Sequence, residues 1–118
     1  MRKLIQSFGY AFNGIGHAVK TQLNFRIELV TAVLSVCLGF ALHISVNEWQ
    51  WVMLNIVLVL MAELFNTAIE FLTDLASPGY NELAGRVKDV SSGAVLISCF
   101  FALTSGTIIF LPKLITLI

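Results

Sequence analysis

The fold is decided by residues 49–76, which read WQWVMLNIVLVLMAELFNTAIEFLTDLA. Most positions before Glu63 are apolar, and the stretch is longer than the roughly 20 residues that an α-helix needs to cross a bilayer. Two more apolar stretches lie at 27–44 and 90–111, and Pro112 is expected to stop the last one. We therefore predict an all-α membrane protein with three transmembrane helices.

Composition supports the same interpretation. The chain has 118 residues, 58% hydrophobic and 12% charged, whereas a soluble domain has about 25% charged residues. Its formal net charge is zero, which excludes the basic surface typical of a nucleic-acid-binding protein. Cys37 and Cys99 lie inside apolar stretches without the spacing of a zinc site. The length suits one domain, so we expect residues 1–118 to form a single membrane domain.

The segment before the first span has a different pattern. Between residues 1 and 24, apolar side chains recur every three or four positions, at Leu4, Ile5, Phe8, Phe12, Ile15, Val19 and Leu23. This spacing places them on one face of a helix. We expect an amphipathic helix that lies in the membrane surface. A soluble helix packed on a partner protein is the alternative.

The distribution of basic residues predicts the orientation. Lys and Arg gather before the first span and between the second and third, at Arg2, Lys3, Lys20, Arg26, Arg86 and Lys88. Basic residues near spans favour the cytoplasmic side. We therefore place the N-terminus and the polar connection 77–89 in the cytoplasm, together with any site for a soluble substrate.

Polar side chains form a stripe along the second span. Its members are spaced by three, four and four residues, at Glu63, Asn66, Glu70 and Asp74. This spacing keeps them on one helical face. Carboxylates inside a membrane normally face a bundle interior, a partner charge or a bound ion. They either pair with Arg86 and Lys88 to lock the bundle, or hold a cation such as Mg²⁺ beside an anionic ligand.

Two strings make the interpretation more specific. ELFNTAIE at 63–70, with Asp74, and AGRVKD at 84–89 resemble the signature of the bacterial diacylglycerol kinase and undecaprenol kinase family. The resemblance extends to FGYAFNG at 8–14 and NFR at 24–26. It implies a small kinase of the bacterial inner membrane, working as a homotrimeric bundle. Such an enzyme moves the γ-phosphoryl group of Mg²⁺-ATP to the hydroxyl of a membrane lipid.

The resemblance also implies roles for individual residues. Glu63 would be the general base, Asn66 would orient Glu63 or the metal, and Glu70 would bind Mg²⁺. Ser92 would lie near the lipid, beside Glu63. The residues that would contact ATP are Lys3, Tyr10, Gln22, Glu70, Tyr80, Asn81, Lys88 and Asp89. Glu63 lies deeper in its span than Glu70. The deeper position suits a general base, and the position nearer to water suits a metal ligand.

One position departs from the family pattern. Gln22 stands where the family usually has a glutamate that helps to bind Mg²⁺. A carboxamide oxygen can coordinate Mg²⁺ but brings no charge. We therefore expect weaker Mg²⁺ affinity with activity retained.

Several functions fit these patterns. Phosphorylation of diacylglycerol to phosphatidic acid is the preferred prediction, and undecaprenol is the alternative lipid. A small multipass transporter that uses Glu63 as its ion-coupled carboxylate is the alternative from another class, but it has no use for Lys88 and Asp89 at the membrane surface. A non-catalytic membrane subunit is the third, and it would tolerate loss of Glu63 and Glu70.

Overall fold

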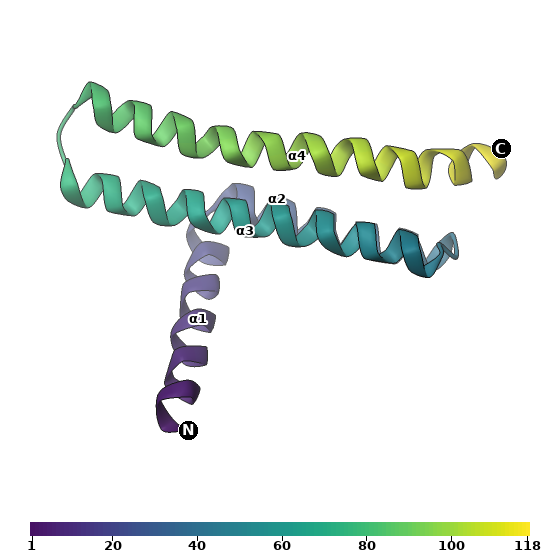
Figure 1. Ribbon diagram of the computed structural model, residues 1–118, viewed down its shortest axis with the longest axis horizontal. Coiled ribbons are helices and arrows are strands. Elements are labelled where there is room, and N and C mark those ends of the chain that lie inside the picture. The colour runs from purple at the N-terminus through teal and green to yellow at the C-terminus, as the bar shows by residue number, and fades with distance from the viewer.

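The computed structural model describes all residues 1–118, and its regular structure is entirely helical (Figure 1). The helices are α1 (Arg2–Thr21), α2 (Leu23–Ala41), α3 (Val46–Ala76) and α4 (Glu82–Thr116). The last three are long and apolar enough to cross a membrane. The predicted fold class, with three spanning helices after an N-terminal helix, is confirmed.

The three long helices lie side by side. Figure 1 shows α3 and α4 running antiparallel along nearly their whole length, with α2 packed on α3. Only 11 of the 118 residues are buried, and most large apolar side chains face outward. A water-soluble protein rarely exposes so much continuous apolar surface. The outward-facing surface is therefore suited to lipid.

The fourth helix is longer than the sequence predicts. It begins at Glu82 rather than near residue 90, because Asn81 caps it. The Asn81 Oδ1 atom accepts hydrogen bonds from the backbone N–H groups of Leu83 (2.9 Å) and Ala84 (3.1 Å). The connection therefore shrinks from the expected 77–89 to residues 77–81. Its four charged residues, expected in a loop, lie instead on the first turns of α4: Glu82, Arg86, Lys88 and Asp89.

The predicted end of this helix was also wrong. Pro112 lies inside α4, which continues to Thr116. Proline removes one backbone donor and is disfavoured in a helix interior. Here it lies close to the C-terminal end, where few turns depend on it.

The turn between α2 and α3 is fixed by a cap on each side. His43 adopts a left-handed conformation (φ 52°), and the Ile44 N–H donates to the Gly39 carbonyl at 3.2 Å. Ser45 then caps α3: its Oγ accepts from the Glu48 N–H, while the Glu48 carboxylate accepts from the Ser45 N–H. The Glu48 carboxylate also pairs with Lys113 at 3.3 Å. These contacts join the three spans at the end of the bundle where α3 begins.

A bent junction separates α1 from α2. Gln22 is extended (φ −111°, ψ 107°) and interrupts the helix there. The Arg26 Nη1 atom donates to the carbonyls of Val19 (3.2 Å) and Lys20 (3.1 Å), which belong to the last turn of α1. The α1 helix consequently points away from the bundle (Figure 1). Its apolar face is exposed in the single chain, and its place in the membrane surface stays a prediction.

Gly39 is a point of close approach between α2 and α3. A Cβ atom at this position would lie 2.6 Å from Trp49 Cη2 and 3.1 Å from Ile44 Cδ1. The indole ring is rigid, so the helices themselves must move to admit a methyl group. A small residue thus lets the spans approach at Gly39, whereas nothing lies within 4 Å of the Cβ position of Gly106.

We therefore predict that Gly39→Ala destabilises the protein by about 1–3 kcal/mol, the usual cost of forcing extra volume into a packed contact. Thermal unfolding in detergent, followed by circular dichroism, measures the change. Gly14→Ala is the matched control, because nothing lies within 4 Å of its Cβ position. It should leave the midpoint unchanged or raise it slightly. Equal midpoints for the two variants would show that the close contact is not required.

Candidate active site

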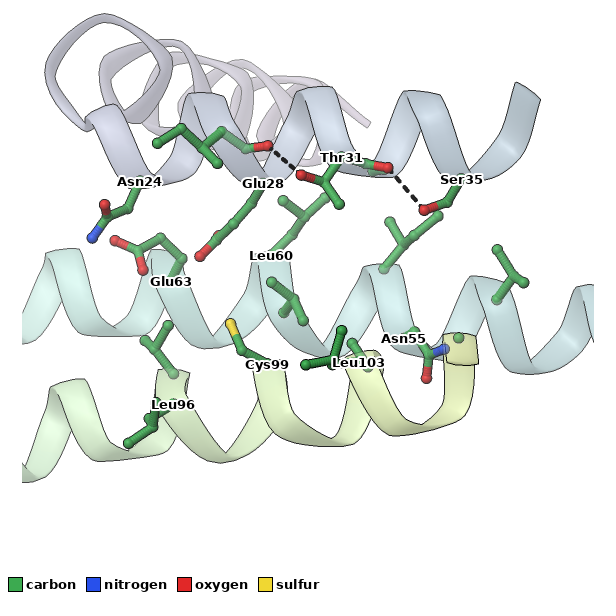
Figure 2. Close-up of a pocket in the computed structure, with 18 of the residues that line it drawn as sticks. Asn24, Glu28, Thr31, Ser35, Asn55, Leu60, Glu63, Leu96, Cys99 and Leu103 are labelled. Atoms are coloured by element: carbon green, nitrogen blue, oxygen red, sulfur yellow. Dashed lines mark hydrogen bonds between the residues drawn. The ribbon is translucent and has the colours of Figure 1, made fainter. Parts of the chain in front are cut away.

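A groove lies between α2, α3 and α4. Its volume is about 870 Å³, and most of the residues lining it are apolar. Polar side chains gather near one end, where Glu28 on α2 and Glu63 on α3 reach toward one another (Figure 2). Asn66 and Ser92 also line the groove. An apolar groove with a few convergent polar groups is the usual form of a binding site for an apolar ligand.

Glu63 is the most deeply buried charged residue of the groove. It is 2% exposed, and its Oε2 atom has no hydrogen-bond partner. Glu63 is 14 residues from Trp49, which lies near the other end of α3, and this separation is about 21 Å along a helix. The hydrocarbon core of a bilayer is about 30 Å thick. A Trp49 at one membrane interface would therefore place Glu63 within the hydrocarbon core, in the half opposite Trp49.

Asn66 lies next to both glutamates of the stripe and donates a hydrogen bond to Glu70. The Asn66 Nδ2 atom donates to the Glu70 carboxylate at 3.2 Å, whereas the Asn66 Oδ1 atom is buried without a partner. The expected role of Asn66, to orient Glu63 or the metal, stays a prediction. Glu70 is partly exposed and Glu63 is buried. Glu63 is therefore the more buried of the two glutamates, and its deeper place in the membrane stays a prediction.

Only one acid of the stripe has a basic partner. Lys88 pairs with Asp74 at 2.5 Å, and Arg86 pairs with Glu82, which is outside the stripe. The side chains of Lys88 and Asp74 are 41% and 62% exposed, so their pair adds little stability. The interpretation of the stripe as a lock on the bundle thus covers Asp74 alone. Glu63 and Glu70 have no basic partner within this chain.

The other predicted ATP contacts do not gather in one chain. Lys3 and Tyr10 lie on α1, whose contact with the bundle is at its far end, where His17 meets the ring of Phe71. Tyr80 is 98% exposed.

Two further predicted residues have local partners. Asn81 uses its side-chain oxygen to cap α4. Gln22 donates weakly to Thr21 at 3.4 Å and does not line the groove. The chain thus brings Glu63, Asn66, Glu70, Asp74 and Lys88 together and leaves Gln22 apart.

Glu28 matches an acidic position that is frequent in the family but was given no place in the predicted site, and it faces Glu63 across the groove (Figure 2). Its Oε2 atom is buried without a partner. Asn24 lies one turn earlier on α2 and lines the same groove (Figure 2). The available signal was a carboxylate inside the predicted span 27–44, the same signal that identified Glu63.

The residues near Glu70 have the chemistry that Mg²⁺ prefers. The Glu70 carboxylate and the unpartnered Asn66 Oδ1 atom are hard oxygen donors. No group of three or more His, Cys, Asp or Glu side chains is arranged to hold a metal ion. Mg²⁺ commonly uses one or two carboxylates and completes its shell with water and substrate phosphates. The donor set therefore fits a metal that arrives with a nucleotide.

Comparison with known proteins identifies the family. The sequence model described as prokaryotic diacylglycerol kinase matches residues 9–110. A diacylglycerol kinase of Synechocystis is 38% identical over 97% of this chain, which spans 66% of that relative's length. An undecaprenol kinase of Bacillus subtilis is 34% identical over 97% of this chain and 93% of its own. A diacylglycerol kinase of Escherichia coli is 32% identical over 91% and 88%.

These relatives favour a kinase over the ion-coupled transporter and the non-catalytic subunit. The buried acids, the apolar groove and the three spans match what a kinase acting on lipid requires. The chain belongs to the prokaryotic diacylglycerol kinase family and is a lipid kinase with ATP as its co-substrate.

Proposed function

We propose that the chain transfers the γ-phosphoryl group of ATP to the primary hydroxyl of diacylglycerol, giving phosphatidic acid. The observation that carries this proposal is the position of Glu63, a buried carboxyl without a basic partner in an apolar groove. Such a groove suits a lipid tail, and the carboxyl suits the hydroxyl at its polar end. The names of the Synechocystis and E. coli relatives favour diacylglycerol.

Undecaprenol is the second candidate acceptor. The B. subtilis relative named undecaprenol kinase covers this chain as fully as the Synechocystis protein does, and the match includes 93% of its own length. A polyprenol also presents one hydroxyl at the end of an apolar tail. Both lipids therefore have to be tested.

Glu63 is the proposed general base. It takes the proton from the lipid hydroxyl while the oxygen forms a bond to the γ-phosphorus and the bond from phosphorus to ADP breaks. Phosphoryl transfer asks the protein mainly for positioning and charge neutralisation. A positioned base contributes about 10²–10⁴-fold. Ser92, which also lines the groove, is the proposed neighbour of the lipid.

Glu70 and Gln22 are the proposed residues for Mg²⁺. Bound Mg²⁺ would neutralise charge on the ATP phosphates. Asn66 holds the Glu70 carboxylate in place through its hydrogen bond. Gln22 would approach from the junction of α1 and α2, where the backbone is extended.

The ATP-binding residues of the bundle are proposed to be Lys88, Asp89, Tyr80 and Asn81. Lys88 is bound to Asp74 but partly exposed. It is therefore able to exchange that carboxylate for a phosphate. Tyr80 and Asn81 lie in the short connection that leads into α4, next to the same end of the bundle.

Lys3 and Tyr10 reach ATP only if chains associate. Within one chain α1 points away from the bundle of α2, α3 and α4 (Figure 1). We propose a homotrimer in which α1 of one copy lies beside the groove of another. Basic residues near the spans favour a bacterial inner-membrane orientation with the N-terminus and this site in the cytoplasm.

We predict that Glu63→Gln lowers kcat by at least about 100-fold, because it removes the base and keeps the shape. The assay uses purified protein in mixed micelles with labelled ATP, with diacylglycerol and undecaprenol as separate acceptors. Glu48→Gln is the control, since Glu48 lies at the opposite end of α3 and should keep wild-type activity. Label on one lipid only identifies the acceptor. An active Glu63→Gln variant, or no label on either lipid, would contradict the proposal.

A second prediction concerns Gln22. Gln22→Glu restores a charged oxygen ligand and should lower the half-saturating Mg²⁺ concentration roughly tenfold. Magnesium titrations at saturating ATP measure this value. Gln6→Glu adds the same charge to an exposed position of α1 and should leave the titration unchanged. Identical titrations for the wild type and Gln22→Glu would show that this position does not touch the metal.

A further inference from the structure

One lysine faces two carboxylates at the end of the bundle where α3 ends and α4 begins. Glu70 and Asp74 lie one turn apart on the same face of α3, about 6 Å along the helix. Lys88 on α4 binds the second of them, with its Nζ atom 2.5 Å from the Asp74 Oδ1 atom. Glu70 is close enough for its charge to act on the Lys88 ammonium as well. The lysine therefore has two acids within the range of its charge and bonds to one of them.

The helix that carries Lys88 offers it no other acid. Side chains three and four positions apart on a helix are neighbours, whereas adjacent residues such as Lys88 and Asp89 do not face each other. The four neighbouring positions hold Ala84, Gly85, Ser91 and Ser92. Glu82 is already paired within α4 at 2.9 Å. Glu70 is consequently the acid left for Lys88 if Asp74 is removed.

A lysine bound to Glu70 would compete with a metal ion. Mg²⁺ binds through carboxylate oxygens, and an ammonium group pairs with the same atoms. In the structure the Glu70 carboxylate accepts a neutral hydrogen bond from Asn66 Nδ2 at 3.2 Å and has no basic partner. Its negative charge is thus available to a cation.

The pair between Lys88 and Asp74 is well placed to be temporary. The two side chains are 41% and 62% exposed, and ion pairs in such positions are weak. Lysine has a flexible four-carbon stem, so the ammonium can leave Asp74 for a phosphate without a movement of either helix. Glu70 is less exposed than Asp74. A pair with Glu70 would therefore be screened less by solvent and would hold the lysine more firmly.

We propose that Asp74 is a positioning residue that holds the Lys88 ammonium away from Glu70. Glu70 then remains free for the divalent cation that arrives with the nucleotide. This inference rests on the proposed function, in which Glu70 binds the metal and Lys88 contacts ATP. It gives a role to the one acid of the stripe that the proposed function leaves unused.

The first test asks which carboxylate Lys88 contacts. A water-soluble carbodiimide joins a lysine amine to a carboxylate beside it, and peptide mass spectrometry locates the amide formed. In the wild-type chain in micelles we expect a link between Lys88 and Asp74. In Asp74→Asn we expect the link to move to Glu70. If Asp74→Asn forms no more of the link to Glu70 than the wild type does, the inference is overturned.

The second test measures the cation. Mn²⁺ replaces Mg²⁺, and electron paramagnetic resonance counts the free ion in the presence of a non-hydrolysable ATP analogue. We expect Asp74→Asn to weaken Mn²⁺ binding about two- to fivefold, the range for an ion pair of this exposure. Asp74→Glu keeps the charge and should keep the wild-type affinity. An unchanged or higher affinity in Asp74→Asn would contradict the proposal.

Two controls separate the lysine from a simple change of charge. Glu82→Gln removes one negative charge from the same end of the bundle, where Glu82 pairs with Arg86, and should leave Mn²⁺ affinity unchanged. In a Lys88→Met background, Asp74→Asn should have no further effect, because the competing ammonium is gone. A weakening that persists without the lysine would overturn the inference.

The outcomes also distinguish this inference from the proposed function. Cross-linking and Mn²⁺ binding need neither a lipid nor phosphoryl transfer. Failure of both, while the wild type phosphorylates diacylglycerol or undecaprenol, would refute the inference and leave the proposed function intact. A wild type that transfers phosphate to neither lipid, although the link moves as expected, would refute the proposed function.

Discussion

A carboxyl group held inside the membrane without a basic partner is the constraint on which this structure depends. Moving a charge out of water is costly unless the charge is paired or hydrogen-bonded. Asp74 meets this requirement with Lys88 near the end of α3. Glu63, about three turns deeper, has no such partner. Its burial is explained if a ligand completes its environment.

Helix caps position the groups around that carboxyl. Asn81 starts α4 immediately after the short connection, and this early start brings Lys88 opposite Asp74. At the other end of the bundle, the box formed by Ser45 and Glu48 begins α3. Gly39 then lets α2 approach α3 closely enough to form one wall of the groove. The site is therefore built by local backbone chemistry as much as by packing.

The sequence predicted what depends on local pattern. Apolar length predicts the three spans, and the spacing of Glu63, Asn66, Glu70 and Asp74 predicts one face. The predictions were wrong where a helix cap or a tertiary contact determines the structure. The start of α4 depends on the cap at Asn81. The residues from Asn81 to Asp89 are too polar to be predicted as part of a membrane span.

Glu28 was missed for a different reason. Its charge was visible inside a predicted span, but its role depends on Glu63, which lies 35 positions away in the sequence and on another helix. Helical periodicity predicts which residues share a face of one helix, but it does not predict which residues of two different helices meet. The same limit applies to Asn66, whose contact with Glu70 is local but whose free oxygen has meaning only within the groove.

The geometry of α1 bears on how the ATP site is completed. Its 20 residues extend about 30 Å from the junction at Gln22. Arg26 holds the last turn of α1, so the direction of the helix is fixed where it leaves the bundle. In that direction α1, which bears Lys3 and Tyr10, leads away from the bundle (Figure 1). If both contact the nucleotide, they reach it in a neighbouring copy, and the apolar face of α1 would remain free to lie against lipid between the two.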